Sequence, residues 1–235
     1  VISAFILPTF SACASTELPV AIHAVNYSNQ EFEYVLQDPA APENSAGGEG
    51  IGRFAAGGTM CCYSLPKKWR PGLQTKINYT YYLPEDAQGN APAVRKSALV
   101  DIPKYAVPEE LWVVRDAAGG MSVISSNFQP NHPKWPGRIK GWPVPSLEYR
   151  RELWQRSMDH EAGNVQLYVD LLSSLKKEPL TRARDAWPLK ATYDPALKSF
   201  TGPTDPRFIA YLKRDYERSL KMVQEHVDQL NGQKP

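Results

Sequence analysis

Two adjacent cysteines are the first residues of this 235-residue chain whose chemistry needs an explanation. Cys61 and Cys62 lie in the stretch GGTMCCYSLPKKWRPG, and three interpretations of the pair remain open. Neighbours in a strand point to opposite faces, so the two can be small apolar residues of a sheet. They can instead form a vicinal disulfide in an oxidising compartment. They can also belong to a metal or redox site, although the chain lacks the paired cysteine spacing of zinc sites.

The other residue types that often do chemistry show no catalytic or metal-binding spacing. The four histidines are scattered along the chain: His23, His132, His160 and His226. Asp159, His160 and Glu161 are consecutive, so on a helix they point in different directions, whereas a ligand face needs a spacing of three or four. There is no Gly-x-Ser-x-Gly elbow, and GGEGIG is not followed by the Lys-Ser/Thr of a phosphate loop. We therefore expect no catalytic residue, no metal and no cofactor.

The N-terminal stretch VISAFILPTFSACAST resembles the end of a bacterial signal peptide. FSAC, with two small residues before Cys13, is similar to a lipobox, although Phe10 stands where leucine is usual. The sequence favours a signal peptide over residues 1–12, a lipid anchor on Cys13 and a linker to residue 18. An ordinary signal peptide cut near Ala12 or Ala14 and a buried first strand are the alternatives. A lipoprotein would lie in the periplasm, and Ala14 after the cysteine favours the outer membrane.

Alternating patterns predict the body that carries the cysteine pair. Seven short strands are expected over residues 19–27, 31–37, 60–66, 73–83, 94–103, 110–115 and 121–128. The first two are expected to form a hairpin, and 38–58 a long loop rich in glycine, alanine and proline. Such strands with turns between them are typical of an antiparallel sandwich. The formal net charge of +2 gives no reason to expect a nucleic acid partner.

The pattern changes after the strands. Residues 129–145 contain five prolines and two tryptophans, so we expect them to wrap over a surface without regular structure. A helical period then begins, with Ser146 as N-cap, and a second helix follows a loop over 179–203, with Thr204 as its cap and Pro206 in its first turn. The predicted class is α+β: a β-sandwich-like domain over 19–145, with two C-terminal helices in a region over 146–235 packed on it.

Several segments together carry a resemblance to a known family. VNYSNQEF, CCYSLPKKWRPG, VDIPKYAVPEELWVV and NFQPNHPKWPG, in this order behind FSAC, resemble a family of bacterial lipoproteins long described only as a domain of unknown function. Its members are encoded beside lipase effectors of the type VI secretion system. The resemblance covers residues 20–140, and it implies a non-catalytic immunity protein that binds and inhibits a phospholipase effector in the periplasm.

Two segments are candidates for binding such an effector. Trp135, Arg138 and Trp142 lie in the proline-rich segment, and stiff loops with tryptophan and arginine make good binding anchors. The alternative is that the tryptophans pack on the sheet and close its edge. Glu49 and Arg53 lie in the glycine-rich loop over 43–56, which could insert into a lipase cleft. Two other functions remain open: an envelope lipoprotein that binds a ligand or assembles a complex, and a hydrolase whose site the sequence does not reveal.

Overall fold

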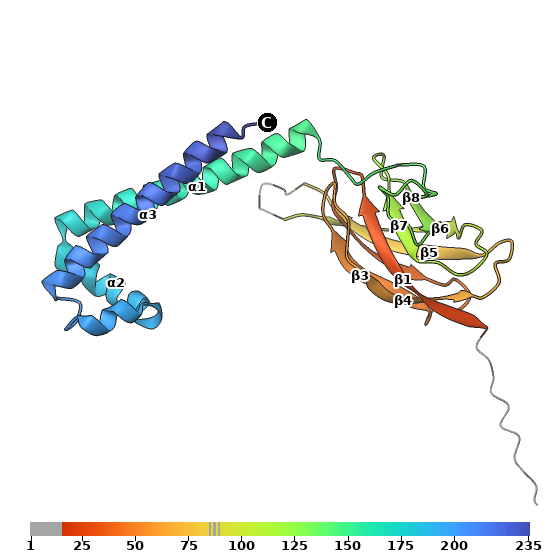
Figure 1. Ribbon diagram of the computed structural model, residues 1–235, viewed down its shortest axis with the longest axis horizontal. Helices are drawn as coiled ribbons and strands as arrows, with labels where there is room; N and C mark the ends of the chain where they lie inside the picture. Colours follow the sequence, from red (N-terminus) through yellow and green to blue (C-terminus); the bar gives the residue numbers. More distant parts are fainter. Residues whose placement is uncertain (1–15, 85, 87, 89) are drawn as a thin grey trace, which may run out of the picture. The chain divides into compact units, whose positions relative to one another are not determined.

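The computed structural model describes residues 16–235 except 85, 87 and 89, so the expected signal peptide and Cys13 lie outside the described residues. The chain divides into two compact units, one up to Pro145 and one from Ser146 (Figure 1). The first unit contains β1 (Glu17–Asn26), β2 (Phe32–Gln37), β3 (Ser45–Ile51), β4 (Met60–Pro66), β5 (Gln74–Tyr82), β6 (Ala93–Asp101), β7 (Leu111–Arg115) and β8 (Met121–Ser125). The second contains α1 (Leu147–Lys177), α2 (Pro179–Tyr193), a 3₁₀ helix (Pro195–Ser199) and α3 (Pro206–Gly232). The α+β class is confirmed.

The strands form two four-stranded sheets. Sheet A has the order β4-β1-β7-β8, and sheet B has the order β3-β2-β5-β6. All pairs are antiparallel except β1 with β7, which run parallel. The predicted hairpin of the first two strands is wrong, because β1 and β2 belong to different sheets.

The connection between β1 and β2 has a side-chain network that turns the chain from one sheet to the other. The buried Asn26 amide donates to the carbonyl oxygens of Gln30 and Gly52, at 2.8 Å each. The Ser28 hydroxyl donates to Asn26 Oδ1 at 2.7 Å. Asn26 thus joins the end of β1 in sheet A to the residue that follows β3 in sheet B.

Strand β3 lies inside the segment that was predicted to be a loop. Its glycines have no side chains, so the sequence shows no alternation of apolar and polar residues. Ala46 and Ile51 are nevertheless buried in the core. Gly47 has φ +125° and pairs with Val35, and a Cβ there would lie 2.7 Å from the Tyr34 carbonyl oxygen. Glycine is therefore required where β3 approaches β2, so the low apolar content reflects close backbone packing.

The main core lies between the two sheets. Its central residues are Ile22, Phe32, Tyr34, Leu36, Tyr63, Leu65, Ile77, Leu111 and Val113. A smaller cluster on the outer face of sheet A joins Val25, Trp112, Val114 and Trp135. Strand β7 is consequently buried on both faces, and all five of its residues are buried.

One of the two predicted helix N-caps is confirmed and the other is wrong. Ser146 caps α1 as predicted, since its hydroxyl accepts from the Tyr149 N–H at 3.1 Å. The cap of α3 is Asp205 and not Thr204, because the Asp205 carboxylate accepts from the Arg207 N–H at 2.9 Å. The Arg207 guanidinium also bonds this carboxylate and holds the pKa of Asp205 well below its usual range.

Helix α2 is one helix more than predicted, in a segment that was expected to be a loop. Pro179 occupies its first turn, where the missing N–H costs nothing. Ala183 and Ala186 are buried with Leu175, Phe208, Leu212 and Tyr216 in the core of this unit. Tertiary packing thus maintains a helix despite Pro188 in its interior. In the part of the chain that the structure describes, no helix has the length and apolarity needed to cross a membrane.

Candidate functional site

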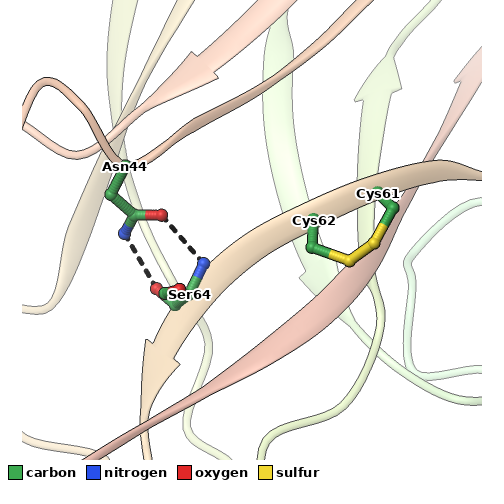
Figure 2. Close-up of a disulfide and its surroundings, with 4 residues drawn as sticks. All are labelled: Asn44, Cys61, Cys62 and Ser64. Carbon is green, nitrogen blue, oxygen red and sulfur yellow. Dashed lines mark hydrogen bonds between the residues drawn. A yellow bond between two sulfur atoms is a disulfide. The ribbon is translucent and has the colours of Figure 1, made fainter.

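Cys61 and Cys62 are joined to each other by a disulfide in β4, an edge strand of sheet A (Figure 2). The peptide bond between them is cis. Val20 pairs with Tyr63 and Ile22 pairs with Met60, so the two cysteines together face the single residue Ala21. The disulfide therefore occupies a β-bulge. Both cysteines are exposed, so neither contributes to the core between the sheets.

Asn44 links the two sheets close to this bulge. Its amide donates to the Ser64 carbonyl oxygen at 2.9 Å and accepts from the Ser64 N–H at 2.8 Å (Figure 2). Asn44 immediately precedes β3 of sheet B, whereas Ser64 belongs to β4 of sheet A. One side chain thus satisfies both backbone groups of Ser64, as a neighbouring strand would do.

Trp135 holds the proline-rich segment against sheet A. Only 2% of its surface is exposed. Its ring meets the ring of Trp112 edge-on, with centroids 5.4 Å apart, and its Nε1 donates to the Ile139 carbonyl oxygen at 2.9 Å. Trp135 is therefore a core residue that fixes its segment, and it offers no free surface to a partner.

Trp142 and Arg138 lie on the same segment but remain exposed. Trp142 is 37% exposed, and its ring centroid lies 6.2 Å from that of Trp112. The Tyr27 hydroxyl donates to the Gly141 carbonyl oxygen at 2.8 Å, and the Lys140 ammonium bonds the Trp135 carbonyl oxygen. Arg138, Trp142 and the largely exposed Val144 belong to what we call the 138–144 strip. In this strip exposed and partly buried residues alternate, and the Tyr27 and Lys140 side chains hold the backbone.

Glu49 and Arg53 do not lie in an extended loop. Glu49 is part of β3, and its carboxylate accepts from the Tyr34 hydroxyl at 3.3 Å and from the Gly58 N–H at 3.0 Å. Burial and the neighbouring Glu49 charge raise the pKa of Tyr34. Arg53 is half-buried in the turn after β3. Glu49 therefore connects β3 to Tyr34 of β2 and to the loop before β4. Arg53 belongs to the turn after β3 and is not part of the 138–144 strip.

His23 was not among the site residues selected from the sequence, yet it lies in a polar cluster. Its Nε2 lies 3.1 Å from Glu110 Oε2, and its Nδ1 lies 3.5 Å from the Thr59 hydroxyl. Its ring stacks on Trp112, with centroids 4.3 Å apart. Hydroxyl, imidazole and carboxylate occur in this order in hydrolases, but 3.5 Å is the outer limit of a hydrogen bond. The pairing of β1 with β7 brings Glu110 to His23, and its pairing with β4 brings Thr59 there, so no spacing in the sequence indicates the cluster.

Arg115 is a buried cation between the sheets. Its guanidinium donates to Gln30 Oε1 at 2.6 Å and lies 5.0 Å from the centre of the Tyr81 ring and 5.4 Å from that of Phe32. Burial lowers the pKa of Arg115. Cation–π contacts stabilise this arrangement and join the end of β7 to sheet B.

The outer face of sheet B is the second surface that could bind a partner. Strands β2, β5 and β6 surround a shallow hollow of about 470 Å³, whose lining includes Glu33, Val35, Asn78, Thr80 and Arg95. This face is polar and balanced in charge. Among the described residues, no three histidine, cysteine, aspartate or glutamate side chains come together as a set that could hold a metal ion.

Comparison with known protein families finds a match for one part of the chain. A family model described as "Protein of unknown function (DUF3304)" matches residues 26–115, from the end of β1 to the end of β7. No curated protein and no solved structure matches the chain. The matched region contains the disulfide, Asn44 and Arg115, whereas the 138–144 strip and the helical unit lie beyond it. The description of the family states no activity.

Proposed function

We propose that the protein is a periplasmic immunity protein that binds and inhibits a phospholipase effector of the type VI secretion system, held at the membrane by a lipid on Cys13. The observation that carries the proposal is the 138–144 strip. Trp135, Tyr27 and Lys140 fix its backbone, while Trp142 and Arg138 stay exposed. A surface that is ordered before binding loses little entropy when the partner arrives.

The residue types of the strip suit an inhibitor. Tryptophan and arginine are the commonest residues at the energetic centre of protein interfaces. A strip of this kind can cover a lipase active site or the surface by which a lipase approaches lipid. The Cys61–Cys62 disulfide is compatible with the oxidising periplasm and would be unusual in a reducing compartment.

The proposal requires a lipase encoded beside this protein, and inhibition of that lipase tests it. Stoichiometric protein is expected to co-purify with the lipase and to abolish phospholipid hydrolysis, and Trp142→Ala with Arg138→Glu is expected to restore hydrolysis. Tyr193→Ala is the matched control, since Tyr193 is an aromatic residue that is 85% exposed in the helical unit. A lipase that stays unbound and fully active with the wild-type protein would overturn the proposal.

The membrane anchor has a separate test. Cys13→Ser removes the only sulfur that a lipobox would modify, so the variant is expected to move from the membrane fraction to the soluble periplasmic fraction. Arg138→Glu is expected to remain in the membrane fraction. Unchanged membrane association of Cys13→Ser would contradict the anchor and leave the inhibition test unaffected.

One feature favours a second candidate function, a non-catalytic envelope lipoprotein that assembles a complex. The helical unit exposes large apolar side chains, including Leu167, Leu189 and Met222. Such side chains can contact another protein. If Leu189→Glu abolished recovery of an envelope complex while lipase activity was unaffected by the wild-type protein, assembly would replace immunity as the proposed function.

A further inference from the structure

Strand β6 is a long, regular edge of sheet B. It pairs with β5 over nine residues, from Ala93 to Asp101, without a bulge. The other edge of this sheet, β3, is irregular, because its pairing with β2 shifts register and two of its glycines have positive φ. Irregular edges resist further strand pairing, whereas a long regular edge permits it.

The hydrogen bonds at the two ends of the β5–β6 pair show which groups of β6 point outwards. Leu83 N–H donates to the Pro92 carbonyl oxygen, and Ile102 N–H donates to the Leu73 carbonyl oxygen. Bonded and non-bonded pairs alternate in an antiparallel ladder, so the even-numbered residues of β6 bond to β5. The N–H and C=O groups of the odd-numbered residues therefore point away from the sheet: Ala93, Arg95, Ser97, Leu99 and Asp101.

These outward-pointing residues are accessible. All five are exposed, and Leu99, at 58% exposed, presents an apolar side chain to solvent. Arg95 and Asp101, six residues apart on this strand, carry opposite charges. An incoming strand would thus find a row of backbone groups that pair with no other strand in the described part of the chain, and side chains of both signs.

A second copy of β6 fits this edge in antiparallel registers that bring opposite charges together. With the two-fold axis at Ala98, Arg95 lies directly opposite Asp101 of the partner subunit. With the two-fold axis at Ser97, Val94 lies opposite Val100 of the partner subunit. Arg95 lies opposite Leu99 of the partner subunit and diagonal to Asp101 of the partner subunit. Opposite charges and β-branched pairs at such positions are favourable. Moving the axis to Arg95 or to Lys96 would place like charges directly opposite each other.

Lys96, the remaining charge on the strand, opposes neither register. With the axis at Ala98 it lies opposite Val100 of the partner subunit. With the axis at Ser97 it lies opposite Ala98 of the partner subunit and diagonal to the partner subunit's Lys96. Its ammonium lies 5.4 Å from the centre of the Tyr81 ring, so a cation–π contact within its own subunit offsets this repulsion.

We infer that two copies of this protein associate through antiparallel pairing of their β6 strands, which joins the two B sheets into one continuous sheet. The inference is independent of the proposed immunity function. Edge pairing of one strand buries less than the roughly 1,600 Å² of a standard interface, so the dimer is expected to be weak and concentration-dependent.

Sedimentation velocity over a concentration series, up to the millimolar range, tests the inference on the whole chain. The wild-type protein is expected to shift from monomer to dimer as concentration rises. Arg95→Asp and Asp101→Arg, made singly, each place like charges directly opposite each other or on the diagonal, and are expected to weaken the dimer about tenfold or more. The double variant restores opposite charges and is expected to recover wild-type association.

Two further variants separate edge pairing from other effects. Ser97→Pro removes an N–H that points outwards, so β5–β6 pairing is retained while dimerisation is lost. Lys76→Glu changes a charge on strand β5, away from the edge, and is expected to leave the dimer unchanged.

Three outcomes would overturn the inference: a protein that stays monomeric throughout, a dimer that survives Ser97→Pro in a folded protein, or a double variant no better than the single ones. Binding of an unrelated extended segment at this edge, without self-association, would also count against it.

Discussion

The outer faces of the two sheets are treated differently by the rest of the chain. The proline-rich segment covers part of sheet A through Trp135, so β7 is buried on both sides. Among the described residues of the β unit, no such segment covers the corresponding face of sheet B, and Val35 and Arg95 lie around an open hollow. The two sheets have equal numbers of strands but different surroundings. The proline-rich segment packs on the outer face of sheet A, whereas the outer face of sheet B is exposed and β6 is an edge strand.

The side chains of the central strands reflect this difference. Strand β7 has the sequence LWVVR, which is apolar to both sides up to its last residue, as expected for a strand with two buried faces. Strand β5 has the sequence QTKINYTYY, which alternates, as expected for a strand with one solvated face. The comparison predicts that substitutions over sheet A cost more stability than substitutions over sheet B.

The largest expected effect is that of Trp135→Ala. The change removes a buried ring that packs with Trp112, Val25 and Val114 on the outer face of sheet A. Large-to-small changes of this kind cost about 3–5 kcal/mol. The free energy of unfolding of the β unit, measured by urea denaturation, should fall by this amount. A loss below about 1 kcal/mol would mean that the segment does not cover sheet A in solution.

A smaller effect is expected from adding one methyl group under the same segment. A Cβ at Gly137 would lie 2.3 Å from Trp135 Nε1 and 2.5 Å from Ile124 Cδ1, so Gly137→Ala should cost about 1–3 kcal/mol through overpacking. Gly50→Ala in sheet B is the matched control, because its Cβ would meet only Glu33 Cγ at 3.8 Å. Denaturation of both variants checks the comparison, and equal losses would contradict it.

Asn44→Ala tests the connection between the two sheets and is expected to cause an intermediate loss of stability. The substitution leaves the N–H and C=O groups of Ser64 without the partners they have now. Leaving a partly buried backbone group unsatisfied costs about 1–3 kcal/mol, and water can replace part of this. Hydrogen exchange of the Ser64 amide should accelerate together with the loss of stability. An unchanged exchange rate would show that the Asn44 bonds are not maintained in solution.

The sequence predicted seven of the strands because their side chains alternate or are β-branched. It could not predict β3, because Gly47, Gly48 and Gly50 carry no side chains to show a pattern. It also gave β1 the wrong partner, since alternation shows that a strand has a buried face but does not show which strand lies beside it. The helix α2 was missed because Pro188 and Trp187 suggested a loop, while burial of Ala183 and Ala186 decided the structure.

The candidate site was predictable as a segment but not residue by residue. Trp135 and Trp142 are seven positions apart in the same proline-rich stretch, and only the structure separates the buried one from the exposed one. His23, Thr59 and Glu110 come together through strand pairing, which no spacing reveals. Glu49 was selected as part of a glycine-rich loop, and the structure places it instead in strand β3, bonded to Tyr34.

The smallest expected effect belongs to the open face of sheet B. Val35 is 37% exposed there and pairs with Asn78 and Gly47 across the neighbouring strands. Val35→Thr keeps the branched shape and the strand propensity, so the free energy of unfolding should change by no more than about 0.5 kcal/mol. Denaturation beside Trp135→Ala gives the contrast directly. A loss near 2 kcal/mol would show that this face is covered in solution, and the two sheets would then no longer differ in the way proposed.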